Sequence, residues 1–244
     1  MGELFKEIKR IPVSKEIMNQ LKDLILNGKI KTGEKIPSER ELTEQFNVSR
    51  NMVREAIRGL EMLGYLEIHQ GAQGGAFVRD FTHDRLSNVF LDFYLADRLS
   101  VKDLVQARLF IEPEVARLAA SHLTNEGSLL LIESLRQEQL KEDIKERIES
   151  LTAVHFVLAK ICGNKFYEIM VHALIAISLE IIVNTFEKGS DPLLHGLGKH
   201  DDIVQAVLNK DAEAAGTLMS KHLEEFAWAF ENLDQRYKHK RSSE

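Results

Sequence analysis

The chain has 244 residues, 44% of them hydrophobic and 29% charged, which is the composition of a globular protein long enough for two domains. Its single cysteine, Cys162, excludes an internal disulfide, and its charged N-terminus carries no signal-peptide pattern, so we expect a cytoplasmic protein. The longest apolar stretch, residues 169–183, is interrupted by His172 and Glu180. We therefore interpret it as a buried core helix and expect no association with a membrane.

The formal net charge of −6 is unevenly distributed along the chain. Residues 1–80 contain 13 basic and 12 acidic side chains, whereas residues 81–244 contain 19 basic and 26 acidic ones. A nearly neutral N-terminal part can bind nucleic acid if its basic groups lie on one face, although net charge alone would not predict it.

Hydrophobic periodicity predicts a first helix over residues 13–27, which Gly28 ends, and a turn-rich connection follows it. Ser38 and Glu41 have the spacing of a capping box at the start of a short second helix that reaches Phe46. Asn47 and Val48 form a tight turn between this second helix and the next one.

Ser49 is the predicted cap of a third helix that continues to Leu63. The period then changes to the alternation of strands over residues 65–69 and 76–79, with a glycine-rich loop between them. A helix-turn-helix followed by a small β-hairpin is a winged helix-turn-helix, so we expect a DNA-binding domain over residues 1–80.

In such a domain the first residues of the second helix of the motif face base edges in the major groove. Arg50 and Arg54 are four residues apart and share one helix face, and the arginine fork matches guanine O6 and N7. Arg40 can reach the same groove or its phosphates, and Gly71 lets the wing backbone approach DNA closely. A merely solvated helix face is the alternative interpretation of each arginine. The predicted DNA contacts are Arg40, Ser49, Arg50, Asn51, Arg54 and Gly71.

Residues 11–80 closely resemble the winged-helix head of the GntR family of transcriptional regulators. The resemblance is strongest in IPSERELTEQFNVSRNMVREAI, where Thr43 stands at the family's usual alanine. It implies that the three arginines contact bases or phosphates and that Gly71 makes the contact at the wing tip. It does not imply which base each arginine reads.

After residue 80 the alternating pattern is absent, and we expect an all-helical domain over residues 81–244. The predicted fold class is therefore mainly α, with one small β-hairpin in the N-terminal domain. About six or seven helices are expected, with boundaries that pattern reading places only within several residues. Their approximate ranges are residues 83–96, 100–123, 126–143, 147–162, 164–187, 191–209 and 211–237.

Three histidines of this domain, His155, His200 and His222, lie in amphipathic segments. Imidazole suits zinc, nickel and similar metals, and helices can supply such ligands to a bundle core. A single helical histidine is more often a surface residue or a hydrogen-bonded core residue, and these three are far apart in the sequence. Spacing alone therefore leaves both interpretations open.

The stretches LFIEPEVARLAASHL, HFVLAKICGN and HDDIVQAVLNKDAEAAGTLMSKHL resemble the FadR-type ligand-binding domain, also called the FCD domain. This resemblance spans most of residues 100–225 and implies that His155, His200 and His222 are metal ligands. Metal-binding members usually carry an aspartate four residues before the first histidine, where this chain has Leu151. A bound metal therefore depends on three histidines with water or ligand, or the pocket is metal-free and takes a larger ligand such as an acyl-CoA.

Arg108 lies four residues before Glu112 in the first of these stretches. Arg108 either forms an intrahelical ion pair with Glu112 or provides the positive charge of the ligand cavity. In the second case it would bind a carboxylate of the effector, because arginine can bind a carboxylate through two hydrogen bonds. The second interpretation predicts an organic acid as the effector.

We expect a homodimeric repressor that binds a pseudo-palindromic operator, with DNA affinity controlled by the effector through the junction at residues 80–83. A metal-dependent enzyme fused to a DNA-binding head is a second hypothesis, although no general base or nucleophile motif accompanies the histidines. A DNA-architectural protein without a sensor is a third, and a helical domain without a cavity would favour it.

Overall fold

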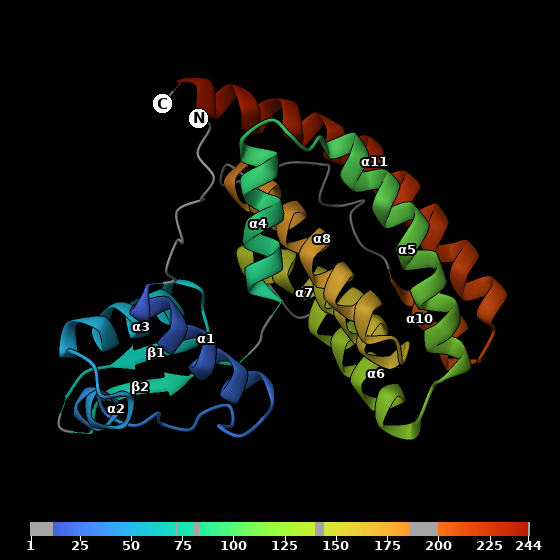
Figure 1. The fold of residues 1–244 in the computed structure, drawn as a ribbon. Helices are drawn as coiled ribbons and strands as arrows, with labels where there is room; N and C mark the ends of the chain where they lie inside the picture. Colours follow the sequence, from blue (N-terminus) through green and yellow to red (C-terminus); the bar gives the residue numbers. More distant parts are fainter. Residues whose placement is uncertain (1–11, 72, 81–82, 140–143, 186–199, 244) are drawn as a thin grey trace, which may run out of the picture. The chain divides into compact units, whose positions relative to one another are not determined.

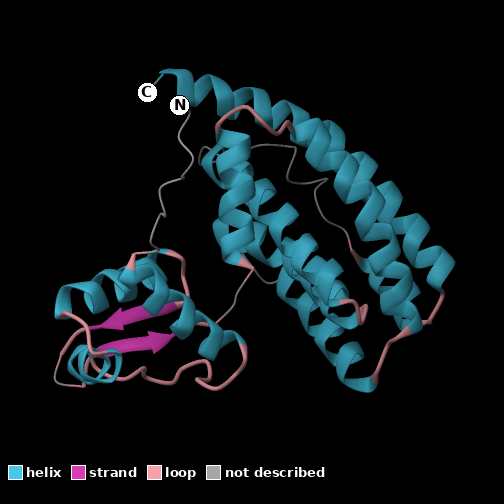
Figure 2. Cartoon of the chain, in the orientation of Figure 1, coloured by secondary structure: helices cyan, strands magenta, loops and turns pink. Residues whose placement is uncertain are grey.

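The computed structural model describes residues 12–71, 73–80, 83–139, 144–185 and 200–243. The chain divides into two compact units between residues 82 and 83 (Figure 1). Figure 2 shows that the described part of the first unit mixes helices with one hairpin, whereas that of the second is helical. This agrees with the predicted mainly α fold class.

The first unit contains three helices followed by two antiparallel strands. They are α1 (Val13–Leu26), α2 (Glu39–Phe46), α3 (Arg50–Met62), β1 (Leu66–His69) and β2 (Gly75–Val78). Leu66 pairs with Val78 and His69 with Gly75, so the hairpin closes around residues 70–74. These bounds lie within two residues of the predicted ones.

A buried apolar cluster joins the helices of this unit to its hairpin. Ile17 and Leu21 come from α1, Val53 and Leu60 come from α3, and Leu66 comes from β1. Their spacing of three, four or seven residues along each helix is what places them on one face. The cluster fixes α3 against the sheet, and α3 is the predicted recognition helix.

The connection before α2, predicted as a series of turns, also forms backbone hydrogen bonds with β2. Gly33 donates its amide to Val78, Val78 donates to Glu34, and Ile36 donates to Ala76, at 2.8–2.9 Å. Through these bonds and an isolated antiparallel bridge between Lys35 and Phe77, the segment lies along the second edge of β2, although no alternating pattern in it predicts this pairing. The wing is thereby supported from both sides.

The capping box predicted for α2 is present. Ser38 accepts from the Glu41 amide, and the Glu41 carboxylate accepts from the Ser38 amide at 2.7 Å. Ser49 occupies the N-cap position of α3 as predicted, but its side chain makes no capping hydrogen bond. Its exposed hydroxyl is therefore not committed to the helix end, which leaves it for another contact.

The second unit is a bundle of helices. They are α4 (Asp84–Leu95), α5 (Val101–Ser121), α6 (Asn125–Gln139), α7 (Ile144–Ile161), α8 (Lys165–Thr185), α10 (Asp201–Leu208) and α11 (Ala212–Ser243). Residues 191–199 of the helix predicted over 191–209 lie outside the described residues. Helix α11 reaches Ser243 and so extends beyond residue 237, where the predicted helix ended.

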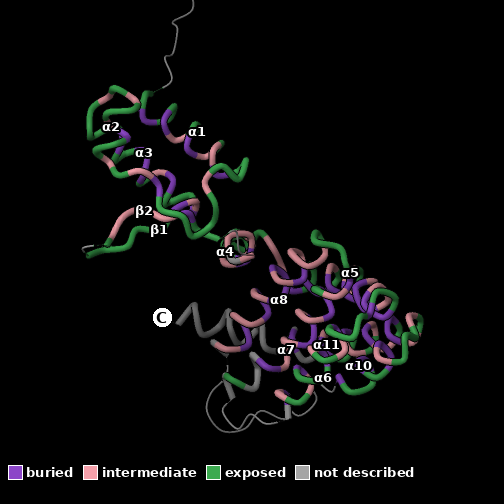
Figure 3. The backbone as a smooth tube through the Cα atoms, turned by 90° about the horizontal axis from the view of Figure 1, so that it is seen from below, coloured by how far each residue is buried: buried purple, intermediate pink, exposed green. Residues whose placement is uncertain are grey.

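Two apolar clusters form the interior of the described bundle. Figure 3 shows in purple the buried residues along its helices. One is built around Ala116, Leu158 and Val207 of α5, α7 and α10. The other is built around Tyr94, Ile177 and Phe230 of α4, α8 and α11. Helices α5 and α8 contribute to both, so they connect the two ends of the domain.

Helix α8 is more apolar than the sequence reading allowed. Residues 165–183 form a window with mean hydropathy 1.9, long enough by composition to cross a membrane. Val171, Ile175 and Ile181 are nevertheless buried within the bundle. This accords with the predicted buried core helix.

Cys162 lies at the end of α7 with no exposed surface, and its thiol donates to the Ala159 carbonyl at 3.0 Å. Burial raises the pKa of this thiol, although a hydrogen bond with Asn164 opposes the shift. Because the thiolate is the reactive form, we expect no labelling by a thiol-specific disulfide reagent at neutral pH in the native protein. Labelling should become fast and complete in denaturant. Rapid labelling without denaturant would contradict this placement.

Candidate functional site

The predicted DNA-contacting arginines lie on the surface of the first unit. Arg50 and Arg54 start α3, and the Glu39 carboxylate at the start of α2 lies 3.5 and 3.6 Å from their Nε atoms. Arg40 lies 3.9 Å from Glu44 on α2. The arginine side chains are 51–81% exposed, so these ion pairs are weak and DNA phosphates can replace the carboxylates at little cost.

Ser49 and Asn51 are also exposed at the start of α3, beside Arg50. The apolar face of the helix is occupied by the core cluster, so its polar start is presented to solvent. A recognition helix uses this end to reach base edges. The geometry thus presents the predicted residues together, on neighbouring ends of α2 and α3.

In the described part of the wing loop, Lys35 contacts Gly74 and Gly75, whereas the space beside Gly71 is unoccupied. The Lys35 ammonium donates to the carbonyl of Gly74, and an added Cβ on Gly75 would collide with the Lys35 side chain. Gly71 has φ of +107°, a conformation that side-chain-bearing residues rarely adopt, and nothing lies within 4 Å of where its Cβ would be. The backbone at Gly71 is therefore accessible for a close approach to DNA.

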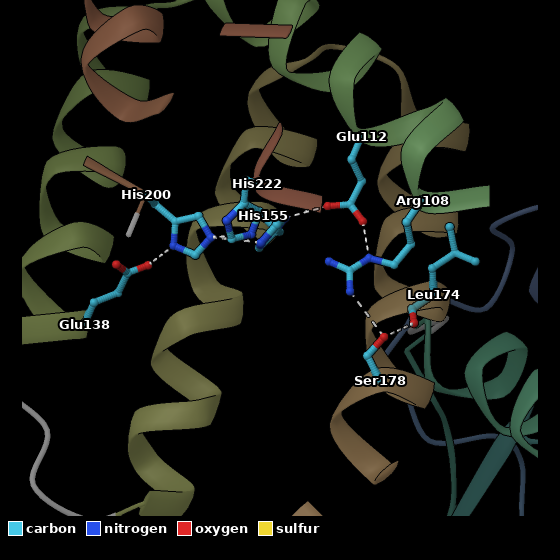
Figure 4. Close-up of polar contacts among 8 residues, drawn as sticks. All are labelled: Arg108, Glu112, Glu138, His155, Leu174, Ser178, His200 and His222. Atoms are coloured by element: carbon cyan, nitrogen blue, oxygen red, sulfur yellow. Dashed lines mark hydrogen bonds and ion pairs between the residues drawn. The ribbon is translucent and has the colours of Figure 1, made fainter. Parts of the chain in front are cut away.

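In the second unit, three helices bring the predicted histidines together (Figure 4). His155 comes from α7, His200 caps α10, and His222 comes from α11. The Nε2 atom of His200 lies 3.0 Å from that of His155 and 3.2 Å from that of His222. Residues separated by up to 67 positions thus point one nitrogen each at a common centre.

Buried carboxyl groups hydrogen-bond to two of these rings at the nitrogen that faces away from the centre. Glu112 of α5 lies 2.5 Å from His155 Nδ1, and Glu138 of α6 lies 2.5 Å from His200 Nδ1. A proton on Nδ1 that faces a carboxylate leaves the lone pair on Nε2. The Glu112 carboxylate therefore orients the Nε2 lone pair of His155 toward the centre, and Glu138 would do the same for His200 when a metal displaces its proton.

The histidines are held in the neutral form that ligates metals. Burial lowers the pKa of His155, lowers that of His200 to about 4 and lowers that of His222 to about 2. Neighbouring histidines lower the pKa of His222 further, whereas the Glu112 carboxylate opposes the shift at all three. Metal binding therefore requires little proton release from the imidazoles themselves.

The two carboxylic acids differ in charge. Burial raises the pKa of Glu112, but Arg108 and His155 outweigh it and hold that pKa well below its usual range. Burial raises the pKa of Glu138 to about 8, with Asp201 adding to the shift and His155 opposing it. Glu112 is thus a carboxylate at neutral pH, whereas Glu138 is a protonated acid.

The donor set fits a divalent transition metal. Nitrogen ligands about 2.0–2.1 Å from a tetrahedral ion lie about 3.3 Å from one another, close to the spacing of the three Nε2 atoms. His155, His200 and His222 would hold the ion, which would supply a Lewis-acidic position for an anionic ligand. Leu151 lies one turn before His155 and offers no ligand atom, so the described protein atoms at the centre are the three nitrogens.

Arg108 forms the intrahelical pair that was one of its two interpretations. Its Nε lies 2.5 Å from Glu112, its Nη1 lies 3.3 Å from Ser178 of α8, and its guanidinium covers the ring of Phe226. Only 4% of Arg108 is exposed, so the pair is buried rather than a solvated surface contact. Figure 4 shows the resulting series of contacts from Ser178 through Arg108 and Glu112 to the histidines.

Glu138 was not singled out from the sequence. It lies on the same face of α6 as Leu131, Ser134 and Leu135, which are buried or half-buried. A carboxylate on an otherwise apolar helix face is the signal that could have identified it, because an unpaired buried acid is costly. Glu112 was considered only as the partner of Arg108, and its second contact, with His155, needed the fold.

A winged helix-turn-helix joined to a helical domain with a buried polar cluster is the arrangement of a ligand-responsive DNA-binding regulator. The family model for bacterial regulatory proteins of the gntR family matches residues 13–78, and that for the FCD domain matches residues 103–225. The HTH-type transcriptional repressor NanR of Salmonella newport (strain SL254) is 30% identical over 226 residues, which cover 89% of this chain and 85% of that protein. NanR of Salmonella typhimurium (strain LT2) is equally similar and is covered to 84%.

A solved structure of a Streptococcus agalactiae GntR protein is 25% identical and covers 88% of this chain and 98% of its own, with a TM-score of 0.60. The chain belongs to the GntR family of bacterial transcriptional regulators and carries a C-terminal FCD domain. The gntR model is that of bacterial regulatory proteins, and the NanR relatives are transcriptional repressors.

Proposed function

We propose that this protein is a homodimeric repressor of the FadR type whose operator affinity is set by a small carboxylate bound at a metal in the FCD domain. The observation that carries the proposal is the convergence of three Nε2 atoms at 3.0–3.2 Å, with carboxyl groups on the opposite nitrogens of two rings. Such pairs of carboxylate and histidine orient metal ligands and raise their basicity. Zinc and nickel both suit a three-imidazole set.

The residues around the triad have separate roles in this proposal. His155, His200 and His222 hold the ion, and the position where relatives carry an aspartate is left by Leu151 to water or to the effector. Arg108 is the candidate second anchor for the effector's carboxylate, since Glu112 joins it directly to His155. An effector that contacts both the metal and Arg108 would alter the contacts between α5, which carries Arg108 and Glu112, and α7, which carries His155.

DNA binding is assigned to Arg40, Ser49, Arg50, Asn51, Arg54 and Gly71 of the first unit. Two copies would occupy the half-sites of a pseudo-palindromic operator in the bacterial cytoplasm. The effector acts through a difference in its affinity for two arrangements of the heads, because a ligand that binds both equally shifts nothing. The proposed hinge is the junction at residues 80–83, of which 81 and 82 lie outside the described residues.

Elemental analysis of the purified, dialysed protein tests the metal centre. We expect about one equivalent of zinc or nickel per chain and less than a tenth of that in His155→Ala/His200→Ala. A His69→Ala/His122→Ala variant, which removes two histidines outside the triad, is the matched control and should retain its metal. Protein without metal in all three samples would overturn this part of the proposal and favour a metal-free pocket for a larger ligand such as an acyl-CoA, which Leu151 makes the second candidate.

A further inference from the structure

A second group of metal-ligating side chains lies in the helical unit, apart from the triad. His83, Glu168 and His172 each offer one ligand atom, and these atoms all lie within 4.8 Å of one another. The Nε2 atom of His83 is 3.8 Å from a Glu168 carboxylate oxygen. The two imidazole rings stack with their centroids 4.1 Å apart.

The secondary structure holds these three residues in place. Glu168 and His172 are four residues apart on α8 and therefore share one helix face. His83 is the N-cap residue of α4, and its carbonyl accepts hydrogen bonds from Leu86 and Ser87 at 3.1 Å. The backbone of each ligand is thus part of a helix or its cap, so only side-chain torsions remain to be adjusted.

The group is partly buried, and its one carboxylate is paired with an exposed lysine. The side chains of His83 and Glu168 are 22% and 17% exposed, so the group is shielded from bulk water without being closed to it. Phe156 stacks on His172 with centroids 4.1 Å apart and an interplanar angle of 3°, which fixes the plane of that ring. The ammonium of Lys165 lies 2.7 Å from Glu168 and is 70% exposed, so it can move into solvent when another cation arrives.

We propose that His83, Glu168 and His172 form a second site for a divalent transition metal, with zinc as the best-suited ion. Two imidazoles and one carboxylate are an established zinc ligand set that leaves a position for water. The 3.8 Å between His83 Nε2 and the Glu168 carboxylate is longer than the 3.0 and 3.2 Å between nitrogens of the triad. The stacked rings of His83 and His172 hold their lone pairs in nearly parallel planes, so the His83 ring must rotate out of the stack before both imidazoles bind one ion. This site therefore binds zinc more weakly than a preformed triad.

The proposed site includes the residue at which the chain enters the helical unit. His83 is the first residue of the second unit, and the ion would tie it to α8. Phe156, which stacks on His172, directly follows His155 in α7, so one turn of this helix carries a triad histidine and a residue that packs against the second group. Occupancy would restrain the residue at which the chain enters the helical unit. The metal site itself does not depend on the triad being loaded.

Zinc titration of the full-length, chelator-stripped protein against a chromophoric chelator tests the proposal. We expect wild type to bind one equivalent more than His83→Ala and one more than Glu168→Gln, two substitutions on different helices. His69→Ala, which removes a histidine from the wing hairpin, is the matched control and should keep the wild-type stoichiometry. In His155→Ala/His200→Ala the same single equivalent should remain and should be lost when His83→Ala is added.

A measurement on wild type needs no substitution and covers the case of a misfolded variant. Diethyl pyrocarbonate modifies accessible imidazoles, and peptide mass spectrometry locates the modified residues. We expect zinc beyond the first equivalent to reduce modification of His83 and His172 at least fivefold, with no change at His69. Unchanged modification of both residues, or equal stoichiometry in wild type, His83→Ala and Glu168→Gln, would overturn the second site.

Discussion

Arg50→Ala and Arg54→Ala should each weaken operator binding about 5- to 150-fold. Each arginine lies at the exposed start of α3, where a two-pronged contact to guanine contributes about 1–3 kcal/mol of discrimination. The Glu39 carboxylate that pairs with both in the protein alone is itself partly exposed, so releasing it costs little. The loss should be larger for the operator than for unrelated duplex DNA.

Fluorescence anisotropy at fixed salt measures this effect, with an operator obtained by selecting duplexes from a random pool with the wild-type protein. Arg136→Ala is the matched control, because Arg136 is an exposed arginine of the helical unit that pairs with Glu133 on the same helix. It should bind DNA as wild type does. Equal affinities for the operator in all four proteins would show that α3 is not the recognition helix.

Glu112→Gln should destabilise the protein by about 3–5 kcal/mol and reduce zinc affinity about 10- to 100-fold. The substitution leaves the buried Arg108 without its counter-charge, and removing one partner of a buried pair carries a cost of this size. It also removes the carboxylate that faces His155 Nδ1, and such partners contribute to metal affinity by that factor.

Urea denaturation measures the stability, and competition with a chromophoric chelator measures zinc affinity. Glu133→Gln is the matched control, because Glu133 also accepts from an arginine on its own helix but is exposed. Its denaturation midpoint should stay at the wild-type value. If the two variants were equally stable, the buried series of contacts from Arg108 to His155 would not support the domain.

Wild type and Glu112→Gln should differ in how much stability they lose on acidification. Arg108 and His155 outweigh burial and hold the folded pKa of Glu112 below that of the unfolded chain. Its contribution is therefore complete above the unfolded pKa and is lost as the pH falls through the folded value. Wild type should lose more stability than Glu112→Gln on acidification.

The sequence predicted the head domain closely because its signals are local. The capping box at Ser38, the change from helical to alternating period after Leu63 and the glycine-rich loop each depend on a few adjacent residues. The pairing of residues 33–36 with β2 was not predicted, because it is a tertiary contact with no sequence pattern of its own.

The candidate site was predicted only in part. The three histidines were identified through a family resemblance, but their convergence depends on three helices packing together, and no spacing rule contains that information. The roles of Glu112 and Glu138 required the same packing, because a carboxylate in a helix is ordinarily a surface residue. The group of His83, Glu168 and His172 combines residues from two helices that are about 85 positions apart.

The measurement that tests the central claim most directly is operator affinity in the presence of small carboxylates. Zinc-loaded wild type and His155→Ala/His200→Ala would be titrated against the selected operator with a panel of monocarboxylates, dicarboxylates, hydroxy acids and keto acids. We expect at least one class to change wild-type affinity by fivefold or more, a typical coupling between two sites, and to leave the variant unchanged within twofold. A wild-type affinity that no carboxylate changes, or a change that persists in the variant, would contradict control of the DNA-binding head from the histidine site.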